Sequence, residues 1–308
     1  MTYSSTLFSH FFSAQRPRLF VIDSGQTFGQ FAQDCLAADR VVNPVCLAPG
    51  SGVSVSVSLP LLLNASMLGN DTQDRDYLGE LEIITRLLIT GCEKREDDRI
   101  SRADRLVIRR SILEAKTTAA MVGRPCIVPT EVAAAMHRIA ALASTEHRRS
   151  IAEMADALEM FCSGPAGDLF NRPGTYWHDA DVTVVDVIGL TRDGFEDQLP
   201  IALVGLASII SDLAENEPHG GRPTLVCMSD STLLEYLLLV THFAAMTKPW
   251  SRLNCSLWLN ESDSLITQVY PHLTKFALTN SASASAGTPR SESRYRNKNV
   301  SLASATCQ

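Results

Sequence analysis

The sequence predicts an α/β protein whose parallel sheet is interrupted by a block of helices. Before residue 72 and after residue 163, short apolar runs that stop at turn residues alternate with longer segments of helical periodicity. Such runs are typical of strands buried on both faces of a parallel sheet. Between them, residues 72–163 show helical periodicity alone. With 45% apolar and 20% charged residues over 308 positions, the composition is that of a folded protein with a sizeable core.

The first part of the sheet is expected in residues 1–71. Four large apolar residues at 19–22 stop at Asp23, and they read as a strand buried on both faces. The further elements expected here are a helix at about 28–38, a strand at 41–47 and, in an otherwise loop-like stretch, an optional strand at 53–57.

The second part of the sheet is expected in residues 164–277, where the same alternation returns. The apolar runs here are short and the helical segments are long, so length alone separates strands from helices. The expected strands are 182–187, 224–228 and 255–259, and the expected helices are about 196–215, 231–247 and 264–276.

Four helices are expected between residues 72 and 163, each with one apolar stripe facing a core. Ser101 with Asp104 three residues later is a capping-box-like start for the second helix, and Thr130 is expected to cap the third. The helices are expected at about 74–90, at 101–121, from 130 onward and at about 146–161. Their stripes are Tyr77, Leu81, Ile84 and Leu88, then Ile108, Ile112, Ala115 and Ala119, then Val132, Met136, Ile139 and Ala143, and last Ile151, Met154, Leu158 and Phe161.

Charge and hydropathy exclude some classes of protein. The net charge of −7 argues against a surface built as a whole for nucleic acid or for an anionic membrane. No uninterrupted apolar run reaches the roughly 18–20 residues of a membrane helix, the longest candidate being 233–246. Residues 1–15 carry no Lys or Arg and no clean apolar segment, so a signal peptide is not expected.

The eight cysteines are spread along the chain without a CxxC pair and without clustered histidines. A zinc site or a disulfide framework would need closer spacing. The sequence therefore predicts reduced thiols and no metal site.

Residues 278–308 differ in composition from the rest of the chain. They are rich in Ser, Ala, Thr and Asn and have a net charge of +3, which leaves −10 for residues 1–277. With almost nothing large and apolar to bury, ordering this segment would cost backbone entropy without compensation. We expect a disordered tail, with a basic arm that touches DNA or lipid as the alternative.

Seven segments between about residues 16 and 265 follow one another in a recognisable order. They are Arg16–Gly29 (RPRLFVIDSGQTFG), Leu78–Ile84 (LGELEII), Arg102–Arg105 (RADR), Glu153–Ala157 (EMADA), Phe170–Gly174 (FNRPG), Glu196–Leu199 (EDQL) and Gly221–Val226 (GRPTLV). In this order and spacing they resemble the conjugative-transfer ATPases. These are the TraC-like motor ATPases of type IV secretion systems and of integrative conjugative elements.

The resemblance implies a RecA-like domain of the P-loop NTPase class with a helical insertion, and ATP and Mg²⁺ in the intact family. It also implies a GxxxxGK[ST] loop, whose backbone and Lys hold the phosphates, one helix before the strand at 19–22. No Gly-Lys pair occurs in this chain, and only about fifteen residues precede that strand. We therefore expect a truncated, degenerate member in which the first P-loop strand is missing. The strands at 19–22 and 224–228 would then either flank a gap or pair directly, and the chain would be poorly stable and prone to association.

The positions that carry chemistry in the family are also changed. After the strand at 224–228 the family has an Asp-Glu pair, of which the Asp orders Mg²⁺ and the Glu polarises the attacking water. This chain has Ser229, which lacks a carboxylate, and Asp230, which is one methylene shorter than Glu and is equally suited to cap the next helix. Ser262 replaces the Gln that senses the γ-phosphate. Arg252 remains, as either a relic of phosphate or subunit contact or a solvated loop residue.

Asp23 and Asp186 both end apolar strands, so the carboxyl edge of the sheet should bring them near the ligand crevice. They mark either a vestigial nucleotide site or two helix caps. We expect no bound cofactor and no metal. A basic face on the second helix of the block consists of Arg102, Arg105, Arg109 and Arg110. We interpret it as a solvated helix face, and the alternative is a face that contacts DNA or a partner.

The sequence thus predicts a conjugative-transfer ATPase-like protein that lacks catalysis. The alternatives are a non-catalytic partner that docks onto an intact motor ATPase, and a gene remnant. The expected partners are type IV secretion components, with DNA contacted indirectly, and the expected location is the cytoplasm or, through partners, the inner membrane. The expected units are a first RecA-like part at 1–71, the helical insertion at 72–163, a second RecA-like part at 164–277 and the tail at 278–308.

Overall fold

The computed structural model describes residues 16–25, 28–48, 76–124, 126–172, 180–195, 197–215, 222–228, 247, 250 and 252–259. The predicted strand 53–57, the helix 264–276, the tail and the helix 231–247 apart from Thr247 lie outside the described residues. The strands are β1 (Arg18–Asp23), β2 (Val42–Cys46), β3 (Val182–Asp186), β4 (Thr224–Met228) and β5 (Cys255–Leu259). The helices are α2 (Gly29–Ala37), α3 (Tyr77–Thr90), α4 (Lys94–Asp97), α5 (Arg102–Met121), α6 (Pro129–Leu142), α7 (Thr145–Glu159), α8 (Gly164–Phe170), the 3₁₀ turn η2 (Ile188–Leu190) and α9 (Gln198–Glu215).

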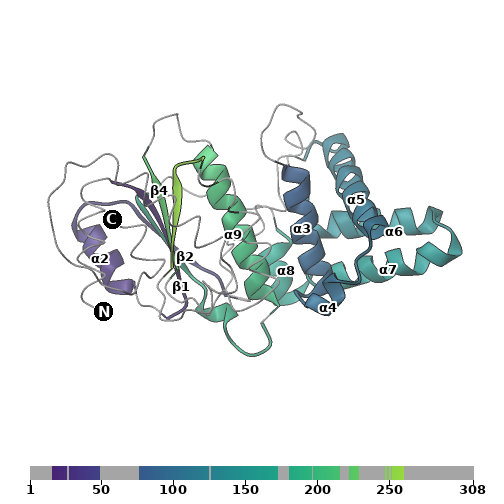
Figure 1. The fold of residues 1–308 in the computed structure, drawn as a ribbon, viewed down its shortest axis with the longest axis horizontal. Coiled ribbons are helices and arrows are strands. Elements are labelled where there is room, and N and C mark those ends of the chain that lie inside the picture. Colours follow the sequence, from purple (N-terminus) through teal and green to yellow (C-terminus); the bar gives the residue numbers. More distant parts are fainter. Residues whose placement is uncertain are drawn as a thin grey trace, which may run out of the picture.

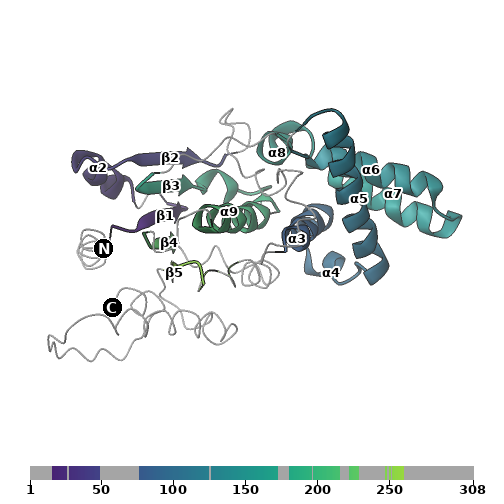
Figure 2. The ribbon, with the colours of Figure 1, turned by 90° about the horizontal axis from the view of Figure 1, so that it is seen from above.

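The described strands form one parallel sheet in the order β2-β3-β1-β4-β5, with β1 at its centre. Figure 1 shows this sheet between α2 and α9, and Figure 2 shows the order of its strands. The strand that begins at Arg18 pairs directly with the one that begins at Thr224, and on its other side with β3. Of the two expected arrangements, the gap is therefore wrong and direct pairing is what the chain adopts. Pro44, which cannot donate a ladder hydrogen bond, lies on β2 at the end of this order, as expected for proline in a sheet.

The two faces of the sheet bury alternate residues of each strand. On β1, Leu19 and Val21 join a small apolar cluster with Cys35 of α2. Phe20 and Ile22 point to the opposite face, where they join the main core. Figure 2 shows α2 on one side of the sheet and α9 on the other, with α3 and then α5–α7 lying beyond α9.

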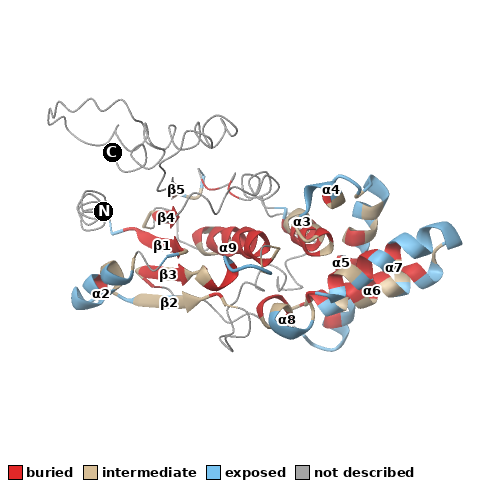
Figure 3. Ribbon diagram, turned by 90° about the horizontal axis from the view of Figure 1, so that it is seen from below, coloured by how far each residue is buried: buried red, intermediate tan, exposed pale blue. Residues whose placement is uncertain are grey.

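The helix α9 is the central helix of the main core. By length and composition alone, α9 could cross a membrane, and the sequence analysis did not identify it because it looked for uninterrupted apolar runs. However, 83% of the helix is buried within the fold (Figure 3). Its apolar side chains pack on the sheet on one side and towards α3 on the other. Burial of this extent is what a core helix of a folded domain requires.

The helical block joins the sheet through α3 and α9. The Tyr77 hydroxyl on α3 donates a hydrogen bond to Glu215 at 3.0 Å, and the Ser208 hydroxyl on α9 donates to Glu80 at 2.9 Å. The predicted stripes of the four helices are buried, with Ile139 and Ala143 partly so. The block and the sheet therefore share one continuous apolar core.

The capping box predicted at Ser101 is confirmed, since its side chain and that of Asp104 each bind the other's backbone N–H. The cap predicted at Thr130 is wrong: α6 begins at Pro129, and Val128 is the capping residue. Proline is favoured in the first helical turn because it has no N–H to satisfy there. Asn171 takes the role of the cap, its Oδ1 accepting from the Thr130 N–H at 3.1 Å, while Glu131 accepts from the Val128 N–H at 2.9 Å. The short elements α4, α8 and η2 were not predicted.

Candidate functional site

The carboxyl edge of the sheet is where a parallel α/β fold places its ligand site. Asp23 ends β1 and Asp186 ends β3, and the two residues lie opposite each other in the strand register. Cys46, the last residue of β2, lies beside Asp186 on the other side. The structure thus brings together the two acidic residues that the sequence placed at this edge.

Asp23 uses its carboxylate to hold the turn between β1 and α2. Its side chain is 2% exposed, and its two oxygens accept hydrogen bonds from the backbone N–H groups of Gly25 at 3.2 Å and Phe28 at 3.1 Å. Phe28 is the capping residue of α2, so Asp23 satisfies backbone donors at the start of that helix. Both oxygens already have backbone donors in this arrangement.

Asp186 has a similar local role on the neighbouring strand. Its carboxylate accepts from the N–H of Ile188 at 2.9 Å and so caps the 3₁₀ turn η2. Burial, with the nearby Asp186 carboxylate adding to it, raises the pKa of the Cys46 thiol. A neutral thiol is a poor nucleophile, so Cys46 is unsuited to covalent chemistry at neutral pH.

Arg252 lies apart from these acids. It is exposed in the turn before β5, hence at the amino edge of the parallel sheet. A strand of five residues separates the two edges by roughly 16 Å. The structure therefore does not bring Arg252 together with Asp23 and Asp186.

The other three predicted site residues, Ser229, Asp230 and Ser262, lie outside the described residues. Within the described ranges the lysines are Lys94 and Lys116, on α4 and α5 of the helical block. The carboxyl edge, as far as it is described, thus holds no lysine that could neutralise phosphate charge.

The amino edge is held together by Arg222, which belongs to one of the segments that carry the family resemblance. Its guanidinium forms an ion pair with Asp181 at 2.7 Å and donates to the Ala180 carbonyl at 3.0 Å. The other oxygen of Asp181 accepts from the Val41 N–H at 3.1 Å. These bonds join the entries of three strands, so the described contacts of Arg222 are structural.

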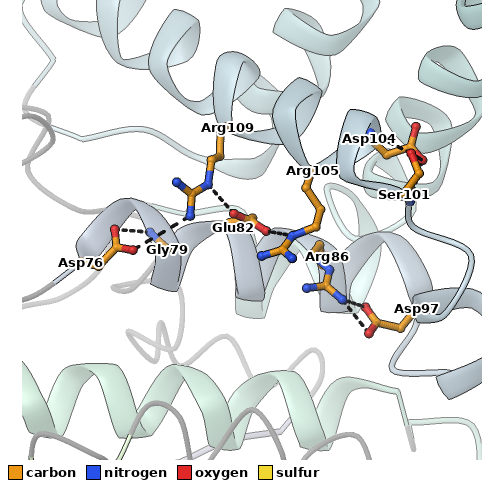
Figure 4. A network of polar contacts seen from close by, with 9 residues as sticks. All are labelled: Asp76, Gly79, Glu82, Arg86, Asp97, Ser101, Asp104, Arg105 and Arg109. Carbon is orange, nitrogen blue, oxygen red and sulfur yellow. Dashed lines mark hydrogen bonds and ion pairs between the residues drawn. The ribbon is translucent and has the colours of Figure 1, made fainter.

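A charge cluster in the helical block was missed by sequence reasoning. Glu82 on α3 has a side chain that is 2% exposed, and it accepts hydrogen bonds from both Arg105 and Arg109 of α5 (Figure 4). Two of the four arginines read as a solvated face therefore clamp α5 onto α3. The i, i+4 spacing of these arginines was visible in the sequence, but their acceptor lies more than twenty residues away on another helix.

The electrostatics of this cluster favour ionised Glu82. Burial by itself would raise the pKa of Glu82, but hydrogen bonds from Arg109 and Arg105 outweigh it, so the pKa is lowered. On α3, the Arg86 guanidinium also binds both oxygens of Asp97 at 2.6 Å. Both carboxylates are thus held by arginines in structural ion pairs, whereas the buried Nε of Arg86 has no hydrogen-bond partner among the described residues.

A group that could hold a metal ion lies at the other side of the helical block, on α6 and α7. It consists of His137, Asp156 and Glu159. The sequence predicted no metal site because its histidines are not clustered with cysteines, and these three ligands come from two helices. The acidic pair three residues apart on α7 was the one available signal.

Comparison with known proteins gives a match in structure. No protein-family model matches the sequence, and no curated protein matches it. The fold is similar to that of VirB4 of Thermoanaerobacter pseudethanolicus, with a TM-score of 0.61 and 14% sequence identity, over 89% of this chain and 68% of that one. The predicted α/β fold with a parallel sheet and helical segments is confirmed, and the family resemblance drawn from the sequence is confirmed at the level of the fold.

Proposed function

We propose that this chain acts in conjugative transfer or type IV secretion as a motor-like protein that does not itself hydrolyse ATP. The observation that carries the proposal is the VirB4-like fold, which extends over 89% of the chain while the residues of phosphate chemistry are replaced. A conserved scaffold alone does not define an activity, because function depends on the site that the fold supports.

The argument against catalysis rests on individual groups. Phosphoryl transfer depends on a Lys, a Mg²⁺-binding hydroxyl and a carboxylate that orients water. The chain has no Gly-Lys pair, and it has Ser229 and Asp230 where the family has Asp and Glu. At the described carboxyl edge, Asp23 and Asp186 already accept backbone hydrogen bonds. Each lost electrostatic contact costs about 10²–10³-fold in rate.

Docking onto an intact motor ATPase is the mode of action we favour. The described part of the chain has a continuous core, the Glu82 ion pairs and the Ser101 capping box. These features would be lost early in a decaying gene, because most substitutions in a core destabilise it. Their presence supports a folded interaction module, held at the cytoplasmic side of the inner membrane through its partners.

A steady-state ATPase assay of the purified 308-residue chain tests the absence of catalysis. We expect turnover at the background level, and we expect Asp230→Ala to leave it unchanged. An intact VirB4-type ATPase assayed in parallel provides the positive control. Turnover that co-elutes with the chain in gel filtration and falls in the Asp230→Ala variant would show that the chain is an enzyme.

The docking mode is tested separately. The chain is mixed with the intact motor ATPase of the same transfer system, and the mass of the species is measured by light scattering. We expect a mixed complex that forms with or without ATP. Two separate species at concentrations of tens of micromolar, with a cooperatively folded chain, would overturn docking while leaving the assignment of the fold intact.

A further inference from the structure

The hairpin of α6 and α7 carries three potential metal ligands on one surface. His137 lies on α6, and Asp156 and Glu159 lie near the end of α7, three residues apart and therefore on the same face of that helix. Only Ala143 and Ser144 separate the two helices in sequence. Ligands on packed helices are held more precisely than ligands on loops. We propose that these three side chains bind a divalent transition-metal ion of the Zn²⁺ class.

The distances between the ligand atoms suit one ion. The Nε2 atom of His137 lies 3.2 Å from Glu159 Oε1 and 3.6 Å from Asp156 Oδ1. All three ligand atoms lie within 4.8 Å of one another. With metal–ligand bonds of about 2.1 Å, neighbouring ligand atoms are about 3.0 Å apart in octahedral and about 3.4 Å apart in tetrahedral geometry. The two distances from His137 therefore require only small side-chain rotations to close on a common centre.

The charges at the site favour a cation. Asp156 and Glu159 place two carboxylates side by side, and among the described residues their close polar contacts are with the His137 ring, not with a Lys or Arg. By contrast, the acidic side chain one turn earlier, Glu153, is paired with Arg149 at 2.7 Å. A divalent ion would neutralise both carboxylates, whereas a single imidazolium would neutralise one.

The ligand chemistry indicates which ion. Imidazole with two carboxylates suits Zn²⁺, Co²⁺ or Ni²⁺, whereas Mg²⁺ and Ca²⁺ prefer oxygen ligands alone. The three side chains are 38%, 70% and 52% exposed, so water can complete the coordination shell. Bound metal would tie α6 to the end of α7 and stabilise the hairpin, because it binds the folded state and not the unfolded one.

The test is a titration of the full chain with Co²⁺ and Zn²⁺, followed by visible absorption and by thermal unfolding. We expect one Co²⁺ spectrum without a thiolate charge-transfer band, displacement of Co²⁺ by Zn²⁺, and a rise of the melting temperature on metal addition. Asp156→Asn should weaken the affinity at least about tenfold, since even outer partners of a metal site contribute 10–100-fold.

His137→Ala should abolish the spectrum and the thermal shift, whereas His147→Ala, a matched exposed histidine on α7, should change neither. Equal affinity in the wild type and in the His137→Ala and Asp156→Asn variants, or a spectrum dominated by thiolate bands, would overturn the proposal. Because Asp156→Asn changes an exposed side chain, it keeps the test valid if His137→Ala fails to fold.

Discussion

The helical block and the carboxyl edge of the sheet use acidic side chains in different ways. In the block, Glu82 is buried against two arginines of another helix, so its charge holds separate elements together. At the edge, Asp23 and Asp186 bind backbone N–H groups two to five residues further along the chain. Charge in the block therefore joins elements that are far apart in sequence, whereas the acidic side chains described at the edge hold the turns that directly follow their own strands.

The largest effect that tests this comparison is expected for Glu82→Ala. It leaves Arg105 and Arg109 without their acceptor, and breaking a buried ion pair costs about 3–5 kcal/mol. Because the two arginines are 47% and 40% exposed and can regain water, we expect a loss of about 2–3 kcal/mol in the free energy of unfolding, measured in urea. Glu153→Gln, at an exposed pair, is the control and should leave the urea midpoint unchanged. Equal midpoints for both variants would mean that the block is not held by this charge.

Protonation of Glu82 is expected to lower the free energy of unfolding by less than removal of its side chain does. Its pKa is lowered below the ordinary value of 4.5, so the folded state favours the ionised form. This contribution is fully present above the unfolded pKa and is lost as the pH falls through the folded pKa. The stability difference between the wild type and Glu82→Gln should therefore be constant near pH 7 and shrink below about pH 4.5. A difference that grows on acidification would contradict the sign of the shift.

For substitutions of Asp23 at the carboxyl edge, we expect a smaller loss in the free energy of unfolding and no change in nucleotide binding. Asp23→Ala leaves two backbone N–H groups without an acceptor, which costs about 1–2 kcal/mol. Asp23→Asn keeps one carbonyl oxygen and should recover part of this loss. Urea unfolding measures both variants, and fluorescence titration with an ATP analogue measures binding. An unchanged stability combined with altered analogue binding would assign Asp23 to a nucleotide site instead.

Much of the fold followed from local pattern. The strands at 224–228 and 255–259 were predicted at their observed bounds, and the capping box at Ser101 was read from two residues three positions apart. Helical stripes and apolar runs report burial because their periods match those of helix and strand. Short elements such as α4 and α8 carry too few residues to show a period, and they were missed.

The candidate site was predictable only in part. Sequence placed Asp23 and Asp186 at the ends of strands, but it left open whether they cap turns or face a ligand. It also read Arg105 and Arg109 as solvated, because their helix carries a polar stripe on that side. Both questions depend on what lies opposite each side chain, and that is set by strand order and helix packing.

The sequence by itself determined the order and kind of the main elements, the faces that they bury and the absence of a Gly-Lys pair from these 308 residues, because these depend on neighbours along the chain. Tertiary structure alone decided that β1 pairs with β4 without a gap, that Arg252 lies at the opposite edge from Asp23, and that His137 meets Asp156 and Glu159. These contacts join residues far apart in sequence. They form only when burial of one shared core fixes the positions of sheet and helices relative to each other.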